Sequence, residues 1–235
     1  MLKASTAILG PSPSTSGYLE AYRRLRAAVM TLKEQRGFAS ALVTSAGAHE
    51  GKTTMAINLA TVLAQAQRET ILIDVDFPRP QVHEVIGMPK EPGVTDVCKG
   101  LITLEEALQD PGIPHLRILP VGGYTSEGAD LASSERMSDV IREAAGLAEY
   151  VLLDGAPVLG YSGTLQLAPH IDLVLFVARA RGYVAPVQRA LRALGDVGAE
   201  VPGIIVNDVM PTDQRYYGYP SYYHYYYYSS KGQSK

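Results

Sequence analysis

The chain has 235 residues and a mass of 25.3 kDa, a size that suits one large α/β domain with an irregular end. Its formal net charge is only −3, which does not favour nucleic acid or an anionic membrane as the main partner. The single cysteine excludes an internal disulfide and fits a reducing compartment. Together with a hydrophobic content of 46%, these totals predict a cytoplasmic protein with ample material for a core.

Helical and strand-like patterns alternate along the chain. Residues 1–14 are rich in serine, threonine and proline, and we expect a flexible leader there. From Thr15 to Gln35 apolar residues recur every three or four positions, which predicts a helix. Further helices are predicted at Thr53–Gln65, Ser134–Leu147 and Val184–Leu194. We predict strands at six continuous apolar runs, which are Ser40–Thr44, Thr70–Asp74, Leu116–Pro120, Tyr150–Asp154, Leu173–Val177 and Gly203–Asn207.

The predicted strands are apolar throughout rather than at alternate positions, as in strands whose two faces are both covered. With helices between them, they give an α/β fold with a doubly wound, mostly parallel sheet and helices on both faces. In such sheets, ligands bind beyond the carboxyl ends of the strands. Polar residues end or follow four of the runs, so we expect one crevice lined by Ser45, Asp74, Asp154 and Asn207.

Residues 46–53 have the sequence Ala-Gly-Ala-His-Glu-Gly-Lys-Thr, close to the phosphate-loop pattern of glycine, four residues, glycine, lysine and serine or threonine. Ala46 replaces the first glycine. Backbone N–H groups before a helix bind phosphate, Lys52 adds a positive charge, and the Thr53 hydroxyl can bind Mg²⁺. The alternative is an ordinary turn with Lys52 in solvent, but a strand before the loop and a helix after it favour a P-loop NTPase fold. The predicted nucleotide-binding residues of the loop are Gly47, Ala48, His49, Glu50, Gly51, Lys52, Thr53 and Thr54.

Three carboxylates are predicted at strand ends near this loop. Asp74 and Asp76 follow one apolar run, and Asp154 ends another. Converging carboxylates suit Mg²⁺, a hard cation usually held by few protein oxygens together with water and phosphate. One of them could instead accept a proton from an incoming hydroxyl. For Asp76, helix capping or turn formation is the structural alternative.

The last part of the chain is rich in tyrosine. Between Arg215 and Tyr228 lie nine of the 15 tyrosines and no aliphatic side chain, so this segment cannot build a core. We expect a disordered tail at residues 212–235. A nucleotide site and a tail of phenolic hydroxyls on one chain suggest that the chain phosphorylates itself. The candidate acceptors are Tyr216, Tyr217, Tyr219, Tyr222, Tyr223, Tyr225, Tyr226, Tyr227 and Tyr228.

Taken together, these motifs resemble the bacterial tyrosine kinase family, the autokinases of capsule and exopolysaccharide synthesis and export. The resemblance implies a kinase domain at residues 15–211. It also implies that the helix with Glu20, Arg23 and Arg26 joins subunits into a ring, since these residues match the family's Glu-x-x-Arg-x-x-Arg motif. The alternative is an amphipathic helix packed on its own domain, with the charges in solvent. The residues that carry the resemblance are Lys52, Thr53, Asp74, Asp76, Arg79, Pro80, Asp154, Pro157 and the tyrosine cluster.

The resemblance implies ATP and Mg²⁺ as cofactors. Lys52 would contact the β- and γ-phosphates, and Asp74 would orient or deprotonate the substrate tyrosine. Asn207 would contact the edge of adenine, which an amide can do as both donor and acceptor. The implied metal-binding residues are Thr53, Asp76 and Asp154, and the implied catalytic set is Lys52, Asp74, Asp76 and Asp154.

The resemblance also implies partners. The tail would be phosphorylated in trans within a homo-oligomeric ring, and each phosphate would add about −1.5 to −2 of charge, which favours monomers. No apolar run approaches the ~20 residues that span a bilayer. A membrane polysaccharide co-polymerase, the chain-length regulator, would therefore recruit the protein to the inner face of the membrane and activate it. A tyrosine phosphatase would reverse the modification.

Some positions depart from the family pattern. His49 stands where glycine is usual, Pro78 replaces a common arginine, and Gly163 stands where aspartate often occurs. One alternative is therefore a nucleotide-binding pseudokinase or scaffold with an aromatic tail. A second is a partition-type ATPase, although these usually carry an extra lysine early in the loop, and residues 45–50 contain none. A third is an adhesive tail unrelated to the nucleotide site.

Overall fold

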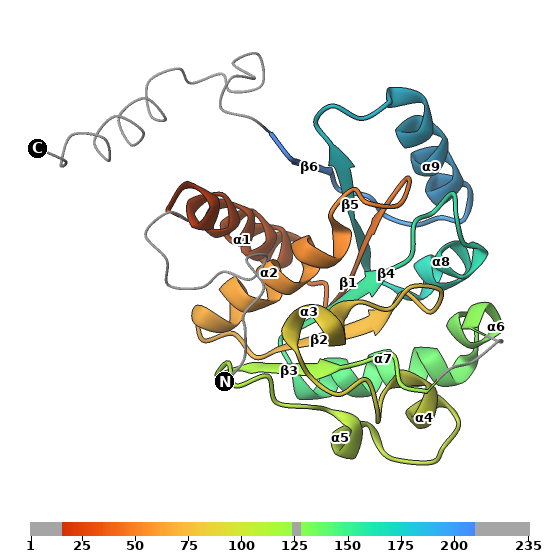
Figure 1. The fold of residues 1–235 in the computed structure, drawn as a ribbon. Helices are drawn as coiled ribbons and strands as arrows, with labels where there is room; N and C mark the ends of the chain where they lie inside the picture. The colour runs from red at the N-terminus through yellow and green to blue at the C-terminus, as the bar shows by residue number, and fades with distance from the viewer. Residues whose placement is uncertain (1–15, 124–127, 210–235) are drawn as a thin grey trace, which may run out of the picture.

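The computed structural model describes residues 16–123 and 128–209. A six-stranded sheet runs through the centre in the order β3-β2-β4-β1-β5-β6, and every pairing between neighbouring strands is parallel (Figure 1). All six predicted strands are present, so the predicted fold class is confirmed. The strands are β1 (Ser40–Ser45), β2 (Thr70–Val75), β3 (Leu116–Leu119), β4 (Tyr150–Gly155), β5 (Leu173–Arg179) and β6 (Ile204–Asn207).

Helices cover both faces of the sheet (Figure 1). One face carries α1 (Ser16–Arg36), α2 (Lys52–Gln65) and α3 (Val82–Ile86). The other carries α4 (Val94–Cys98), α5 (Leu104–Ala107), α6 (Gly128–Ala132), α7 (Glu135–Leu147), α8 (Ser162–Leu167), the short 3₁₀ helix η2 (Ala168–His170) and α9 (Val184–Asp196). The four predicted helices correspond to α1, α2, α7 and α9 within two residues at each end.

Successive strand residues enter two separate cores. In β2, Ile71 and Ile73 pack under α4, α7 and their neighbours, whereas Leu72 packs under α1 and α2. This alternation follows from the two-residue period of a strand. Because both cores are apolar, the strands have to be apolar at every position, which explains the continuous runs in the sequence.

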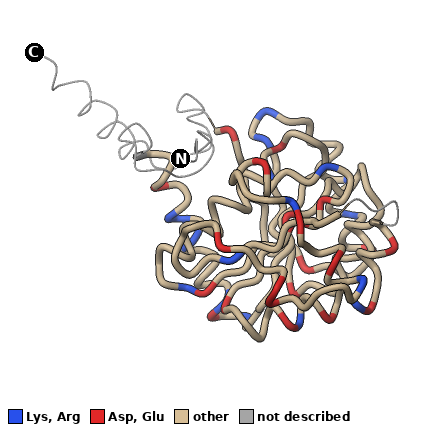
Figure 2. The backbone as a smooth tube through the Cα atoms, turned by 60° about the horizontal axis from the view of Figure 1, so that its bottom comes forward, with Lys and Arg blue, Asp and Glu red and all other residues tan. Residues whose placement is uncertain are grey.

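In the described part of the chain, positively and negatively charged residues are not segregated along the backbone. Figure 2 shows lysine and arginine interspersed with aspartate and glutamate around the molecule. The edge strand β6 is less covered than the others, with Ile204 and Val206 more than 40% exposed. In the described ranges, no helix combines the length and the apolar character needed to cross a bilayer.

Candidate nucleotide site

The loop between β1 and α2 contains two residues in the left-handed region of backbone conformation. Gly51 has φ +91°, a conformation that favours glycine, and an added Cβ would stand 2.1 Å from Nδ2 of Asn207, which would have to move. His49 also lies in the left-handed region, at φ 63°. A non-glycine residue adopts that region at a cost of about 1 kcal/mol, so the departure from glycine at position 49 strains the loop without preventing it from forming.

Lys52 begins α2 and is turned into the domain. Its Nζ lies 2.6 Å from Oδ2 of Asp76, and the two side chains are 11% and 2% exposed. The other oxygen of Asp76 accepts the backbone N–H of Arg79 at 3.1 Å. The turn role of Asp76 and its position beside Lys52 are therefore both present, and the interpretation of Lys52 as a solvated surface residue is wrong.

Asp74 is fully buried within β2. Its Oδ1 and Oδ2 accept the backbone N–H groups of Asp76 and Val82, each at 3.1 Å. Burial raises the pKa of Asp74 well above its usual value, and the neighbouring Asp154 raises it further, against the effect of the two amides. Asp74 thus fixes the backbone that carries Asp76 and begins α3, and its role toward a substrate tyrosine stays a prediction.

Asp154 lies opposite Asp74 in the register of β4 and β2. It is fully buried, and neither carboxyl oxygen has a hydrogen-bond partner among the described residues. Burial raises the pKa of Asp154 to about 7, although the charge of Lys52 and the nearby Thr53 hydroxyl oppose the rise. An unpartnered buried carboxylate is costly, and a cation beside Thr53 would remove that cost.

These residues fit Mg²⁺ only in combination with phosphate. The described residues contain no group of three or more histidine, cysteine, aspartate or glutamate side chains arranged to hold a metal, so the three carboxylates do not form one protein-only site. Mg²⁺ commonly takes one or two protein ligands and completes its shell with water and phosphate oxygens. Thr53 and Asp154 would supply those ligands, while Asp76 is paired with Lys52.

Asn207 joins the last strand to the loop. Its Nδ2 donates to the carbonyl oxygen of Glu50 at 3.0 Å, so its amide nitrogen is already engaged. Next to it, Asp208 accepts from Nε of Arg179 at 2.7 Å. Ser45, Asp74, Asp154 and Asn207 all lie at or near the carboxyl ends of their strands, as expected. A common crevice lined by these four residues stays a prediction. Contact of Asn207 with adenine stays a prediction.

Comparison with known proteins assigns this arrangement to a family. The sequence model of the CobQ/CobB/MinD/ParA nucleotide binding domain matches residues 41–220. Tyrosine-protein kinase YwqD of Bacillus subtilis is 30% identical over 201 residues, which cover 85% of each chain. The chain belongs to the bacterial tyrosine-protein kinases of this nucleotide-binding family.

Other members of this kinase family are longer or more distant. The putative tyrosine-protein kinase EpsB of Ralstonia solanacearum is 28% identical over 87% of this chain, and the match spans only 27% of its own length. The kinase domain of Escherichia coli tyrosine kinase ETK has the same fold, with a TM-score of 0.81, 23% identity, and coverage of 88% of this chain and 82% of that domain.

Gly163, which departs from the expected family pattern, packs against Tyr161. A Cβ at this position would stand 2.4 Å from Cε1 of Tyr161, so the tyrosine ring occupies the space that a side chain at 163 would need. Burial raises the pKa of Tyr161, and the charges of Asp76 and Asp130 raise it further. Sequence analysis did not single out Tyr161, although an aromatic residue two positions before an unexpected glycine was the available signal. Pro78, the third departure, is exposed.

The charged residues proposed for ring assembly have different surroundings. Arg26 donates from Nη1 to the carbonyl oxygen of Val62 at 2.9 Å and is partly buried. Glu20 and Arg23 are exposed, and Glu20 pairs with Arg24 at 3.4 Å. The helix α1 packs on α2 through buried Tyr22 and Val29, as the amphipathic alternative predicted. Ring assembly through Glu20, Arg23 and Arg26 stays a prediction.

Two predicted segments, the leader at 1–14 and the tail at 212–235 with its nine tyrosines, lie outside the described residues.

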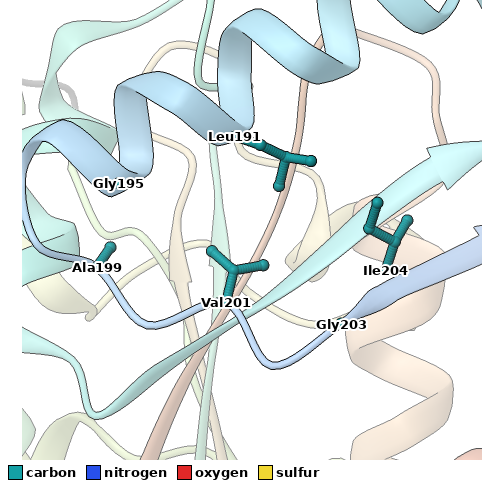
Figure 3. A pocket seen from close by; sticks show the side chains of 6 residues that line it. All are labelled: Leu191, Gly195, Ala199, Val201, Gly203 and Ile204. Carbon is teal, nitrogen blue, oxygen red and sulfur yellow. The ribbon is translucent and has the colours of Figure 1, made fainter.

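An apolar hollow of about 430 Å³ lies between α9 and the start of β6, at the opposite end of β6 from Asn207 (Figure 3). It contains no titratable or nucleophilic side chain and is separate from the nucleotide site. Its lining residues are Leu191, Gly195, Ala199, Val201, Gly203 and Ile204.

Proposed function

We propose that the chain is an ATP-dependent protein-tyrosine kinase that phosphorylates its own C-terminal tyrosines. The observation that supports this most strongly is the buried Lys52–Asp76 pair beside the unpartnered Asp154 at the end of the phosphate loop. Phosphoryl transfer from a nucleotide uses a loop that binds phosphate, a positive charge on the phosphates and a carboxylate that can hold Mg²⁺. The phosphate loop, Lys52 and Asp154 would supply these three parts.

In this proposal, the loop amides and Lys52 bind the phosphates of ATP. Lys52 moves its ammonium group from Asp76 to the phosphate oxygens, which leaves the Asp76 carboxylate available as a hydrogen-bond acceptor. Mg²⁺, held by Thr53 and Asp154, would neutralise charge on the phosphates. Asp74 orients the reaction indirectly, because its carboxylate holds the backbone N–H of Asp76.

The transfer step joins the phenol oxygen to the γ-phosphorus and breaks the bond from that phosphorus to the β-γ bridging oxygen, so ADP leaves. The phenolic proton passes to a carboxylate, a role that we propose for Asp76 once Lys52 has turned to the phosphates. Catalysis of this kind depends mainly on placing the hydroxyl in line and stabilising charge. We propose that the hydroxyl comes from a neighbouring subunit in a ring assembled through α1. The side-chain amide of Asn207 would contact the adenine ring of ATP.

The proposed partners follow from the same assignment. A membrane polysaccharide co-polymerase would recruit and activate the kinase at the inner face of the membrane, and a tyrosine phosphatase would reset it. Phosphorylated tails crowded in one ring would repel each other and loosen it. The regulated process would be capsule or exopolysaccharide synthesis and export.

The decisive experiment is incubation with Mg-ATP and the cytosolic tail of the candidate activator, followed by mass spectrometry of residues 215–235. We expect phosphotyrosine in the wild type and none in Lys52→Met or Asp74→Asn. Nucleotide binding without any phosphotyrosine would contradict the kinase proposal and favour a nucleotide-responsive scaffold. Normal phosphorylation of either variant would show that the residue roles are wrong.

A further inference from the structure

The side chain of Glu50 folds back over the phosphate loop to which it belongs. Its Oε1 lies 3.7 Å from the position that a Cβ on Gly47 would take. Burial raises the pKa of Glu50, and the backbone N–H groups of Ala46 and Gly47 act in the opposite direction because they lie against the carboxylate. A negatively charged group therefore stands over loop amides that can also bind phosphate.

One oxygen of the Glu50 carboxylate has no hydrogen bond from the described residues that would explain its position. Oε2 of Glu50 is buried and has no hydrogen-bond partner among the described residues. A carboxylate kept only for stability would have both oxygens hydrogen-bonded or in water. The backbone nevertheless holds Glu50 in place, since its carbonyl accepts from Asn207 and the residues on either side, His49 and Gly51, both have positive φ.

The loop offers a phosphate two positively polarised groups, which are the Lys52 ammonium and the backbone N–H groups. A carboxylate of the chain itself already lies beside each of them. Asp76 neutralises Lys52, and the Glu50 carboxylate lies over Gly47, with Oε1 3.7 Å from the position of a Cβ on that residue. One N–H group cannot serve the Glu50 carboxylate and a phosphate oxygen at full strength simultaneously. Either Glu50 turns away when nucleotide binds, or its charge repels the phosphates at short range.

We propose that Glu50 is an internal competitor for the phosphate site, which lowers the affinity of the loop for nucleotide and must swing out when the phosphates bind. The proposal rests on the nucleotide binding assigned above, but not on phosphoryl transfer. Glu50 thus has a role opposite to that of an ordinary phosphate-binding residue. Removal of the Glu50 carboxylate should make the loop bind nucleotide more tightly.

The test is isothermal titration calorimetry of ADP with the full chain, both with Mg²⁺ and in EDTA. Glu50→Gln keeps the shape of the side chain and removes its charge, and Glu50→Ala removes the side chain beyond Cβ. The matched control is Glu105→Gln on α5, an exposed glutamate whose replacement makes the same change in net charge. Lys52→Met tests nucleotide binding itself.

We expect Glu50→Gln and Glu50→Ala to bind ADP about five- to twentyfold more tightly than the wild type, with Glu105→Gln unchanged. The gain should persist in EDTA, because the competition concerns N–H groups rather than a metal. Equal or weaker binding by both Glu50 variants would overturn the proposal, as would a gain confined to Mg-ADP. If the wild type binds ADP and Lys52→Met does not, failure of the Glu50 prediction leaves the nucleotide site standing. If no variant binds ADP, both proposals fall.

Discussion

The two ends of the sheet each carry an aspartate, and the two carboxylates differ in their hydrogen bonding. At the amino end, Asp172 precedes β5 and accepts from the N–H groups of Ala39 and Ser40 at 2.8 Å and from the Ser40 hydroxyl at 3.0 Å. Burial alone would raise the pKa of Asp172, but these hydrogen bonds and the charge of Lys33 lower it overall. At the carboxyl end, Asp154 has no hydrogen-bond partner among the described residues, and its pKa rises.

This difference suggests that Asp172 contributes to stability, whereas Asp154 is kept for binding. A carboxylate with three donors ties β1 to β5, whereas a buried carboxylate without donors destabilises the fold until a ligand arrives. Proteins accept such unsatisfied groups mainly where function needs them. We therefore expect substitutions at the two ends to affect stability in opposite directions.

Replacement of Asp154 should have the largest effect. We expect Asp154→Asn to raise the free energy of unfolding by about 1–3 kcal/mol at pH 8. If Asp154 holds Mg²⁺ as proposed, the same substitution should lower the rate of tail phosphorylation about 100-fold. The folded pKa of Asp154, about 7, lies above that of the free carboxyl, so this group makes the unfolding free energy fall as the pH rises from about 4 to about 7. Urea denaturation at several pH values checks both statements: the stability advantage of the variant should grow up to pH 7. A variant less stable than the wild type at pH 8 would contradict the comparison.

At the opposite end, Asp172→Ala should lower the free energy of unfolding by about 1 kcal/mol, since the partly exposed donors of Ala39 and Ser40 lose their acceptor. The dissociation constant for ADP should stay within about twofold of the wild type, since the substitution lies at the far end of β1. Urea denaturation and calorimetry measure the two quantities. Asp196→Ala, an exposed aspartate at the end of α9, is the control and should change neither.

An effect of similar size is expected where Tyr161 covers Gly163. Gly163→Ala should cost about 1–2 kcal/mol of stability, because the new Cβ would overlap the tyrosine ring. In a double-mutant cycle with Tyr161→Ala, the alanine at 163 should cost less by about 1 kcal/mol. Thermal unfolding of the four proteins gives the coupling energy. Strictly additive effects would mean that the ring does not determine the residue at 163.

The sheet was predictable because its signal is local and strong. Each strand is an apolar run of four to seven residues, and the ends of β1 to β6 match their predicted ends within two residues. The helices α3 to α6 and α8 were not predicted, because four to six residues give too little periodicity to detect. Their positions depend on side chains such as Val82 and Leu104, which are buried only once the sheet has formed.

The site was predictable in composition but not in pairing. The phosphate-loop pattern and the carboxylates identified Lys52, Asp74, Asp76 and Asp154 without indicating which of them interact. The Lys52–Asp76 pair, the backbone contacts of Asp74 and the position of Glu50 over its own loop depend on tertiary geometry. The bond from Arg26 to Val62 likewise joins residues 36 positions apart, a distance at which sequence spacing carries no information.

The bond between Asn207 and the carbonyl of Glu50 has a mechanical consequence. A displacement of the chain that follows β6 would reach Asn207, the last residue of that strand, before any other part of the site. From there it is transmitted directly to the backbone that sets the direction of the Glu50 side chain. A single side-chain amide therefore couples the end of β6 to the backbone of the phosphate loop.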